Sequence, residues 1–137
     1  MTAGGVVLDA SVALSWAFDD EQGSIPDVIE STLVSGFACV PASWPSEIAN
    51  ALVAGVRRGR ISAAGAEAFM DELLFLDIRF EAPVAPSPAL VQFAFDAGLS
   101  AYDAEYVLLA RQRDLPLATG DGRMREAALA VGVEVVG

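Results

Sequence analysis

Short apolar runs alternate with longer amphipathic stretches along most of this 137-residue chain. Residues 5–9 (GVVLD) and 37–41 (FACVP) are almost wholly apolar, as strands are when helices cover both faces of a parallel sheet. Further strands are expected at residues 76–80, 116–119 and 133–136. Because helical patterns separate these runs, the sequence predicts an α/β fold with three layers, α/β/α, around a central parallel sheet.

Proline, serine and glycine mark the expected ends of the helices. Pro26 and Pro88 suit first helical turns, Ser62 suits an N-cap, and Gly98 suits a helix end. The predicted helices cover residues 11–18, 26–36, 44–58, 62–75, 88–98, 100–114 and 122–132. No second core or linker interrupts the pattern, so residues 1–137 are expected to form a single domain in which residues 44–75 make a protruding helical hairpin.

Charge and hydropathy narrow the classes of function. Hydrophobic residues make up 54% of the chain, and the net charge is −11. Such acidity argues against non-specific binding of nucleic acid. It does not exclude an enzyme that binds a nucleic acid through bound metal and a small basic patch. Neither an apolar stretch of membrane-spanning length nor a signal-peptide pattern is present, so we expect a cytoplasmic protein without membrane contact.

Several residue types are missing altogether. The chain contains no His and no Lys, and Cys39 is its one cysteine. Catalysis by Ser-His-Asp or Cys-His groups, a P-loop lysine, a Schiff base and a His/Cys zinc site are therefore all excluded within this chain. Cys39 lies in the apolar run FACV and is interpreted as a small buried hydrophobe.

Four acidic residues occupy the same kind of place. Each of these residues follows a strand or lies at the start of a helix. The four are Asp9, Glu47, Asp103 and Asp121. Each one alone could be a helix cap or a favourable charge at a helix N-terminus. In a parallel sheet, however, these positions meet at the carboxyl edge of the strands, where ligands bind. Clustered carboxylates need a cation, and hard oxygen ligands favour Mg²⁺ or Mn²⁺.

Three polar residues lie beside these acids. Ser11 is two residues after Asp9, and Thr119 is two residues before Asp121. Both hydroxyls are expected to hydrogen-bond carboxylates or metal-bound water, although capping and turn formation are the alternative. Asn50, three residues after the second acid, is expected on the same face of its helix as a further positioning residue.

Other candidate groups have weaker signals. Glu105 is expected to be solvated, and Tyr102 and Tyr106 are interpreted as a packed pair four residues apart. The arginines within residues 57–60 either complement the C-terminal dipole of their helix or form a phosphate-binding edge.

Four segments together resemble one known family. VVLDASVALSW, PSEIANAL, GLSAYDAEYVLLA and LATGDGRM are similar, in order and spacing, to the four acidic segments of PIN-domain proteins, and specifically of VapC-type toxins from bacterial toxin–antitoxin pairs. The resemblance covers nearly the whole chain. It implies a small α/β fold with a parallel sheet, a Mg²⁺- or Mn²⁺-dependent ribonuclease, a cognate antitoxin that covers the site, and a homodimer.

The resemblance also assigns positions. The four acids match the family's acidic cluster, with Asp9 and Asp103 as the foremost metal ligands, and Thr119 matches the polar residue before the last acid. Gly120 and Gly122 depart from the family pattern, since bulkier residues commonly flank the last acid.

The leading hypothesis is hydrolysis of RNA phosphodiesters by a water activated at this site. A VapB-type antitoxin should contact so acidic a chain through a segment rich in Arg or Lys. A catalytically inactive PIN-like binding module is the alternative. An aspartyl-nucleophile phosphatase is a weaker third, because lysine is absent.

Overall fold

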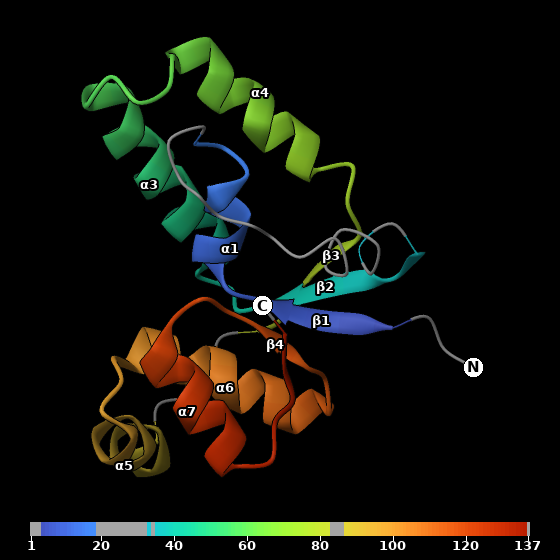
Figure 1. Ribbon diagram of the computed structural model, residues 1–137, viewed down its shortest axis with the longest axis vertical. Coiled ribbons are helices and arrows are strands. Elements are labelled where there is room, and N and C mark those ends of the chain that lie inside the picture. The colour runs from blue at the N-terminus through green and yellow to red at the C-terminus, as the bar shows by residue number, and fades with distance from the viewer. Residues whose placement is uncertain (1–3, 19–32, 34, 83–86, 137) are drawn as a thin grey trace.

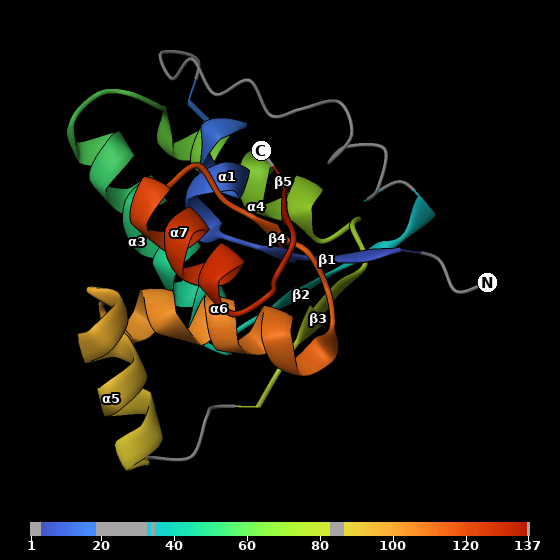
Figure 2. The same ribbon diagram turned by 60° about the horizontal axis from the view of Figure 1, so that its bottom comes forward.

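A computed structural model describes residues 4–18, 33, 35–82 and 87–136 of the chain. Most of the predicted helix 26–36 lies outside the described residues. Over the described ranges the structure is a parallel sheet between two layers of helices (Figures 1 and 2), which confirms the predicted α/β/α fold.

The sheet has five described strands, all parallel, in the order β3-β2-β1-β4-β5. They are β1 (Gly5–Leu8), β2 (Phe37–Val40), β3 (Ile78–Phe80), β4 (Leu117–Ala118) and β5 (Val135–Val136). The chain starts at the centre, builds outward through β2 and β3, and returns to the other side of β1 with β4. The strand order therefore reverses beside β1, and ligands bind at the carboxyl ends of strands at such a switch point.

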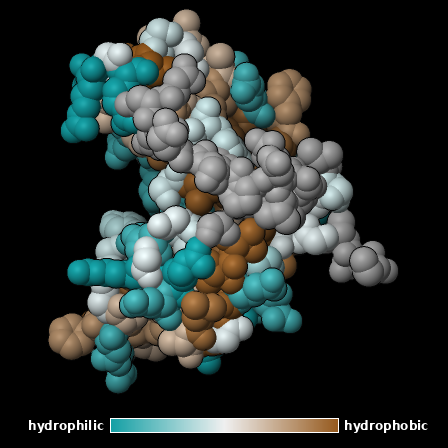
Figure 3. Space-filling model, in the orientation of Figure 1, coloured by the Kyte–Doolittle hydropathy of each residue, from teal (hydrophilic) through white to brown (hydrophobic). Residues whose placement is uncertain are grey.

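The helices form the two outer layers. One layer holds α1 (Ala10–Ser15), α3 (Trp44–Arg57) and α4 (Ala63–Leu73), and the other holds α5 (Pro88–Ala97), α6 (Ala101–Arg113) and α7 (Gly122–Ala130). The hairpin of α3 and α4 reaches away from the sheet (Figure 1). The surface is hollowed between the two helical layers, on the side where the strands end (Figure 3).

Local signals account for most helix boundaries. The hydroxyls of Ser62 and Ser100 accept hydrogen bonds from the third residue of each helix, Gly65 N at 2.9 Å and Asp103 N at 3.1 Å, as N-caps do. Gly98 ends α5 in the left-handed region, with φ 68°, where a residue without a Cβ is favoured. Two predicted helices are too long, since the first ends at Ser15 and the fourth at Leu73.

The core surrounds β1. Val7 and Leu8 are completely buried, because helices cover both faces of the central strand. The indole N–H of Trp44 donates to the carbonyl of Leu8 at 3.0 Å, which fixes the start of α3 against the end of β1. Among the described residues, no helix combines the length and the apolar character needed to cross a membrane.

Candidate active site

Asp9 lies directly after β1 and is 6% exposed. Its carboxylate oxygen Oδ2 accepts hydrogen bonds from Ser11 Oγ at 2.8 Å and Thr119 Oγ1 at 3.0 Å. The other oxygen, Oδ1, accepts a longer bond of 3.3 Å from the backbone N–H of Ser11, so Asp9 also caps α1. Three donors thus hold this carboxylate in one orientation at the carboxyl edge of the central strand.

Thr119 connects the first and the last acidic segments. It is completely buried just after β4, beside β1 in the sheet. Its hydroxyl donates to Asp9 and accepts from the backbone N–H of Asp121 at 3.1 Å. One side chain therefore fixes the position of both segments.

Glu47 lies in the first turn of α3, on the opposite side of the sheet from α6. Its Oε1 atom accepts a hydrogen bond from the hydroxyl of Tyr106 on α6 at 3.2 Å and a longer one from Ser43 Oγ at 3.4 Å. The Tyr106 hydroxyl in turn accepts from the backbone N–H of Ala10 at 3.3 Å. Glu47 is thus held between the N-terminal turn of its own helix and the residue that follows Asp9.

The role of Tyr106 was missed by the sequence analysis, which paired it with Tyr102. Tyr106 is completely buried, whereas Tyr102 is 66% exposed. Burial, followed by the nearby Glu47 and Asp9 carboxylates, raises the pKa of Tyr106 far above its ordinary value, so the hydroxyl stays protonated and able to donate. A signal existed in the sequence: Tyr106 is three residues after Asp103 and therefore lies on the same side of the helix.

Neighbouring acids contribute to the raised pKa values of Glu47 and Asp103. Burial is the main cause that raises the pKa of Glu47, and Asp9 and Asp103 raise it further, while hydrogen bonds from Tyr106 and Ser43 oppose the rise. Burial also raises the pKa of Asp103, with additional contributions from Asp9 and Asp121. Within the described ranges, the charged groups that act on these two carboxyls are all carboxylates, so their repulsion is left without a compensating cation.

Asp121 also caps a helix. It is exposed, and its Oδ1 atom accepts from the backbone N–H groups of Arg123 at 2.8 Å and Met124 at 3.1 Å. Asp121 is therefore the N-cap of α7. Only its other oxygen is free of this capping role.

Two more residues lie near Glu47. Asn50 is exposed on α3, one turn beyond Glu47. Ser43, which the sequence analysis did not single out, contacts the Glu47 carboxylate directly. Ser43 directly precedes α3, and a serine before a helix is ordinarily read as an N-cap, so the sequence offered little reason to select it.

Cys39 cannot serve as a nucleophile at neutral pH. Burial and a 3.3 Å hydrogen bond from its thiol to Glu81 Oε1 raise its pKa to about 11. The thiol therefore stays protonated, and thiolate is the reactive form.

The donor chemistry of the four acids suits a hard divalent cation, because uncompensated carboxylate oxygens are the ligands that Mg²⁺ and Mn²⁺ prefer. The four carboxylates are spaced more widely than the ligands of a fully formed metal site. In the part of the chain that the structure describes, no group of three or more acidic or thiol side chains is placed so that it could hold an ion. Coordination by three or more of them would require these side chains to draw together.

Comparison with known proteins decides the family. The chain is 32% identical over 109 residues to Ribonuclease VapC1 from two strains of Mycobacterium tuberculosis, which covers 77% of this chain and 79% of the relative. It belongs to the VapC ribonuclease family. No protein-family model matches the chain.

Solved structures agree with the PIN-like fold of this VapC family member. PAE2754 from Pyrobaculum aerophilum superposes with a TM-score of 0.72 at 22% identity, over 98% of this chain and 85% of the other. FitAcB from Neisseria gonorrhoeae gives 0.65 at 16% identity, over 96% of each chain. VapBC2 from Rickettsia felis, bound to a DNA fragment from its promoter, gives 0.59 at 11% identity, over 96% of this chain and 97% of the other.

Proposed function

We propose that this VapC family member is a Mg²⁺- or Mn²⁺-dependent endoribonuclease that hydrolyses RNA phosphodiester bonds at the site formed by Asp9, Glu47, Asp103 and Asp121. The observation that carries the proposal is the placement of the acids at one edge of the sheet: Ser11 and Thr119 orient Asp9, and Tyr106 joins Glu47 to the residue after Asp9. Burial raises the pKa of Glu47 and of Asp103, and repulsion by neighbouring carboxylates raises both further. Such repulsion is relieved when a divalent cation binds. Because RNA is its substrate, we place its activity in the cytoplasm.

Asp9 and Asp103 are the residues that would hold the cation, with Asp121 and Glu47 completing the set. A divalent ion in this place supplies positive charge to the phosphate and makes water more acidic. Asp9 is oriented for the task by Ser11 and Thr119. Asp121 contributes through the oxygen that does not cap α7.

Glu47 is suited to take the proton of the attacking water. Its Oε1 atom is occupied by Tyr106 and Ser43, which leaves Oε2 to face the water. A carboxyl with a raised pKa is a better general base than an ordinary glutamate. Since the chain has no His or Lys, solvent water supplies the proton for the leaving oxygen.

Two partners belong to the same proposal. A VapB-type antitoxin would inhibit the enzyme, and its contacting segment would be basic because this chain has a net charge of −11. The likeness to FitAcB and VapBC2 supports such a partner. A homodimer is the proposed assembly of the free enzyme.

The test replaces Asp9 with Asn and measures cleavage of single-stranded RNA with Mn²⁺ and with EDTA. Loss of one carboxylate charge should reduce cleavage by more than about a hundredfold while the circular dichroism spectrum stays unchanged. The matched control is Asp96→Asn, an exposed position on α5, which should cleave like the unmodified chain.

Calorimetry with Mn²⁺ separates this proposal from the alternative of an inactive binding module. The enzyme should bind Mn²⁺ at millimolar concentration or below, and Asp9→Asn should not. Full cleavage by Asp9→Asn would refute the proposal, and absence of any Mn²⁺ binding would favour the module.

A further inference from the structure

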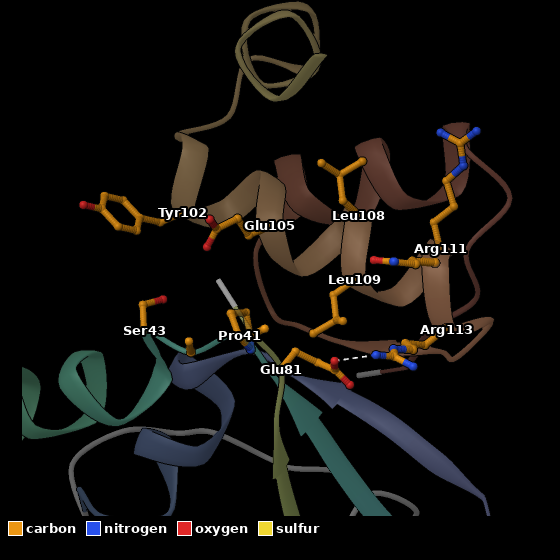
Figure 4. A pocket seen from close by; sticks show the side chains of 12 residues that line it. Pro41, Ser43, Glu81, Tyr102, Glu105, Leu108, Leu109, Arg111 and Arg113 are labelled. Atoms are coloured by element: carbon orange, nitrogen blue, oxygen red, sulfur yellow. Dashed lines mark hydrogen bonds and ion pairs between the residues drawn. The ribbon is translucent and has the colours of Figure 1, made fainter. Parts of the chain in front are cut away.

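A pocket of about 930 Å³ lies beside the acidic site, at the same edge of the sheet. Its walls are the turn after β2, the end of β3 and one face of α6 (Figure 4). The ion pair between Arg113 and Glu81 closes one end. The volume falls within the range of sites that bind small molecules or single groups of larger ones.

Ser43 joins the pocket to the acidic site. It lines the pocket, and its hydroxyl donates to Glu47. Tyr102, at the same end of the pocket, directly precedes Asp103 in sequence. A group that enters this end of the pocket therefore contacts Ser43, the hydrogen-bond partner of Glu47.

Glu105 is the acidic side chain at this end. It is half-buried, and it makes no hydrogen bond or ion pair with any described residue. Figure 4 shows its carboxylate directed toward the space beside Ser43. Glu105 was expected to be solvated, and it is partly exposed where it lines the pocket. It lies on the side of α6 turned away from Asp103, because two residues correspond to about 200° of helical rotation.

The surfaces around Glu105 suit a flat, partly apolar group. Pro41, Leu108 and Leu109 supply apolar walls. The exposed ring of Tyr102 stands at the mouth, and aromatic rings of this kind stack nucleobases in single-stranded RNA.

The charge of Glu105 selects among possible occupants. A carboxylate repels phosphate, so the backbone of a nucleic acid is disfavoured at this position, while groups with N–H donors are favoured. Among the nucleobases, guanine presents two adjacent N–H donors, at N1 and N2, which match the two oxygens of one carboxylate. Adenine, cytosine and uracil each present one such donor group beside acceptors.

We propose that this pocket receives the base of the nucleotide next to the scissile phosphodiester, and that Glu105 selects guanine by accepting hydrogen bonds from N1–H and N2–H. This inference rests on the proposed function, since it takes RNA as the substrate. Glu105 is then the residue that sets where the enzyme cuts, while the four carboxylates of the acidic site carry out the cleavage.

The experiment uses oligouridine RNAs with one central guanosine, inosine, adenosine or 2-aminopurine nucleotide. Inosine lacks the N2 amino group, and 2-aminopurine lacks the N1 hydrogen. The full chain with Mn²⁺ should cleave beside guanosine with a kcat/KM at least about fivefold above that for inosine and 2-aminopurine, the low end of the discrimination from one bidentate pair.

Glu105→Gln changes the pattern of donors and acceptors with little change in shape. Its amide can accept from adenine N6–H and donate to N1, so the preference should move from guanosine to adenosine. Glu72→Gln, an exposed glutamate on α4, makes the same change of charge away from the pocket and should keep the preference for guanosine. Equal preferences in the unmodified chain and Glu105→Gln would overturn the proposal.

Equilibrium binding of the same RNAs in EDTA, followed by fluorescence anisotropy, separates failure of this inference from failure of the proposed function. Suppose that the chain cuts no RNA but binds the guanosine RNA more tightly than the inosine RNA, and that Glu105→Gln abolishes this difference. The assignment of the pocket to guanine is then supported, while the proposed ribonuclease function fails. Cleavage without discrimination between guanosine and inosine overturns the pocket alone. A third outcome is that a hexa-arginine peptide inhibits RNA cleavage by the unmodified chain but not by Glu105→Gln, while both proteins keep the same base preference. This outcome would assign the pocket to a basic protein partner and overturn the assignment to RNA.

Discussion

The hydroxyl of Tyr106 donates to the carboxylate of Glu47, a residue 59 positions away in sequence, at 3.2 Å. The same hydroxyl accepts from the backbone N–H that follows Asp9. A single buried atom thus sets the position of one acid relative to another, although it carries no charge itself. Helices from opposite layers of the fold meet at this point.

Tyr106→Phe should therefore affect both stability and pH dependence. Loss of the hydroxyl leaves the N–H of Ala10 without its partner and should lower the free energy of unfolding by about 1–3 kcal/mol. It also removes a bond that lowers the pKa of Glu47, so the acidic limb of the activity profile should move to higher pH. Urea denaturation and pH–rate profiles measure the two effects. Tyr102→Phe, at an exposed position, should change stability by less than about 0.5 kcal/mol.

Glu47→Gln should change how stability depends on pH in the absence of divalent ions. A carboxyl with a pKa raised by folding stabilises the folded chain fully below its unfolded pKa, and this stabilisation is lost as pH rises through the folded pKa. The Glu47 pKa is raised above the ordinary 4.5, so its ionisation opposes folding at neutral pH. The variant should thus gain stability relative to the unmodified chain as pH rises above about 4, the ordinary pKa of glutamate.

The lowered pKa of Glu81 acts in the opposite direction, because its stabilisation is lost as pH falls. It is present in both proteins and cancels in the difference between them. Urea titrations in EDTA at several pH values measure that difference, and a difference that does not vary with pH would contradict the prediction. Gln at position 47 keeps an oxygen that can accept from Tyr106.

Thr119→Val should destabilise the fold despite its similar shape. The substitution removes the donor to Asp9 and the acceptor for the N–H of Asp121. A hydrogen bond to a charged group contributes about 1.5–3 kcal/mol, so a loss of that order is expected in chemical denaturation. Thr119→Ser retains the hydroxyl and should recover most of the loss; a Ser variant as unstable as the Val variant would argue for packing instead.

Asp121 offers a way to separate capping from catalysis. Asp121→Ala removes the acceptor at the start of α7 and should cost about 1 kcal/mol. Asp121→Asn keeps an N-cap acceptor and should unfold within about 0.5 kcal/mol of the unmodified chain, yet it loses the charge proposed for metal binding. We expect reduced RNA cleavage in Asp121→Asn, by less than in Asp9→Asn. Unchanged cleavage in Asp121→Asn with a destabilised Asp121→Ala would make Asp121 a cap alone.

Local signals in the sequence located most of the described elements of the fold. The strand in the apolar run 5–9 and the N-cap Ser62 depend on neighbouring residues, and they were predicted correctly. The order of the strands was not predicted, because the pairing of β1 with β4 joins distant parts of the chain.

The candidate site was likewise predictable from the sequence only in part. Acids at strand ends follow from topology, so Asp9 and Asp121 were expected at one edge of the sheet. The roles of Tyr106 and Glu105 depend on how α6 is rotated against the sheet and α3, and that rotation is set by packing over the whole core rather than by local pattern.

The pairing of β1 with β4 also has a consequence during protein synthesis. Asp9 leaves the ribosome early, but its partner Thr119 lies 110 positions later in the chain. Until Leu117 and Ala118 have been translated and have added to the sheet, one edge of β1 stays open and the first acid lacks a hydroxyl that orients it. A nascent or interrupted chain that lacks these residues therefore cannot orient its first acid as the folded chain does.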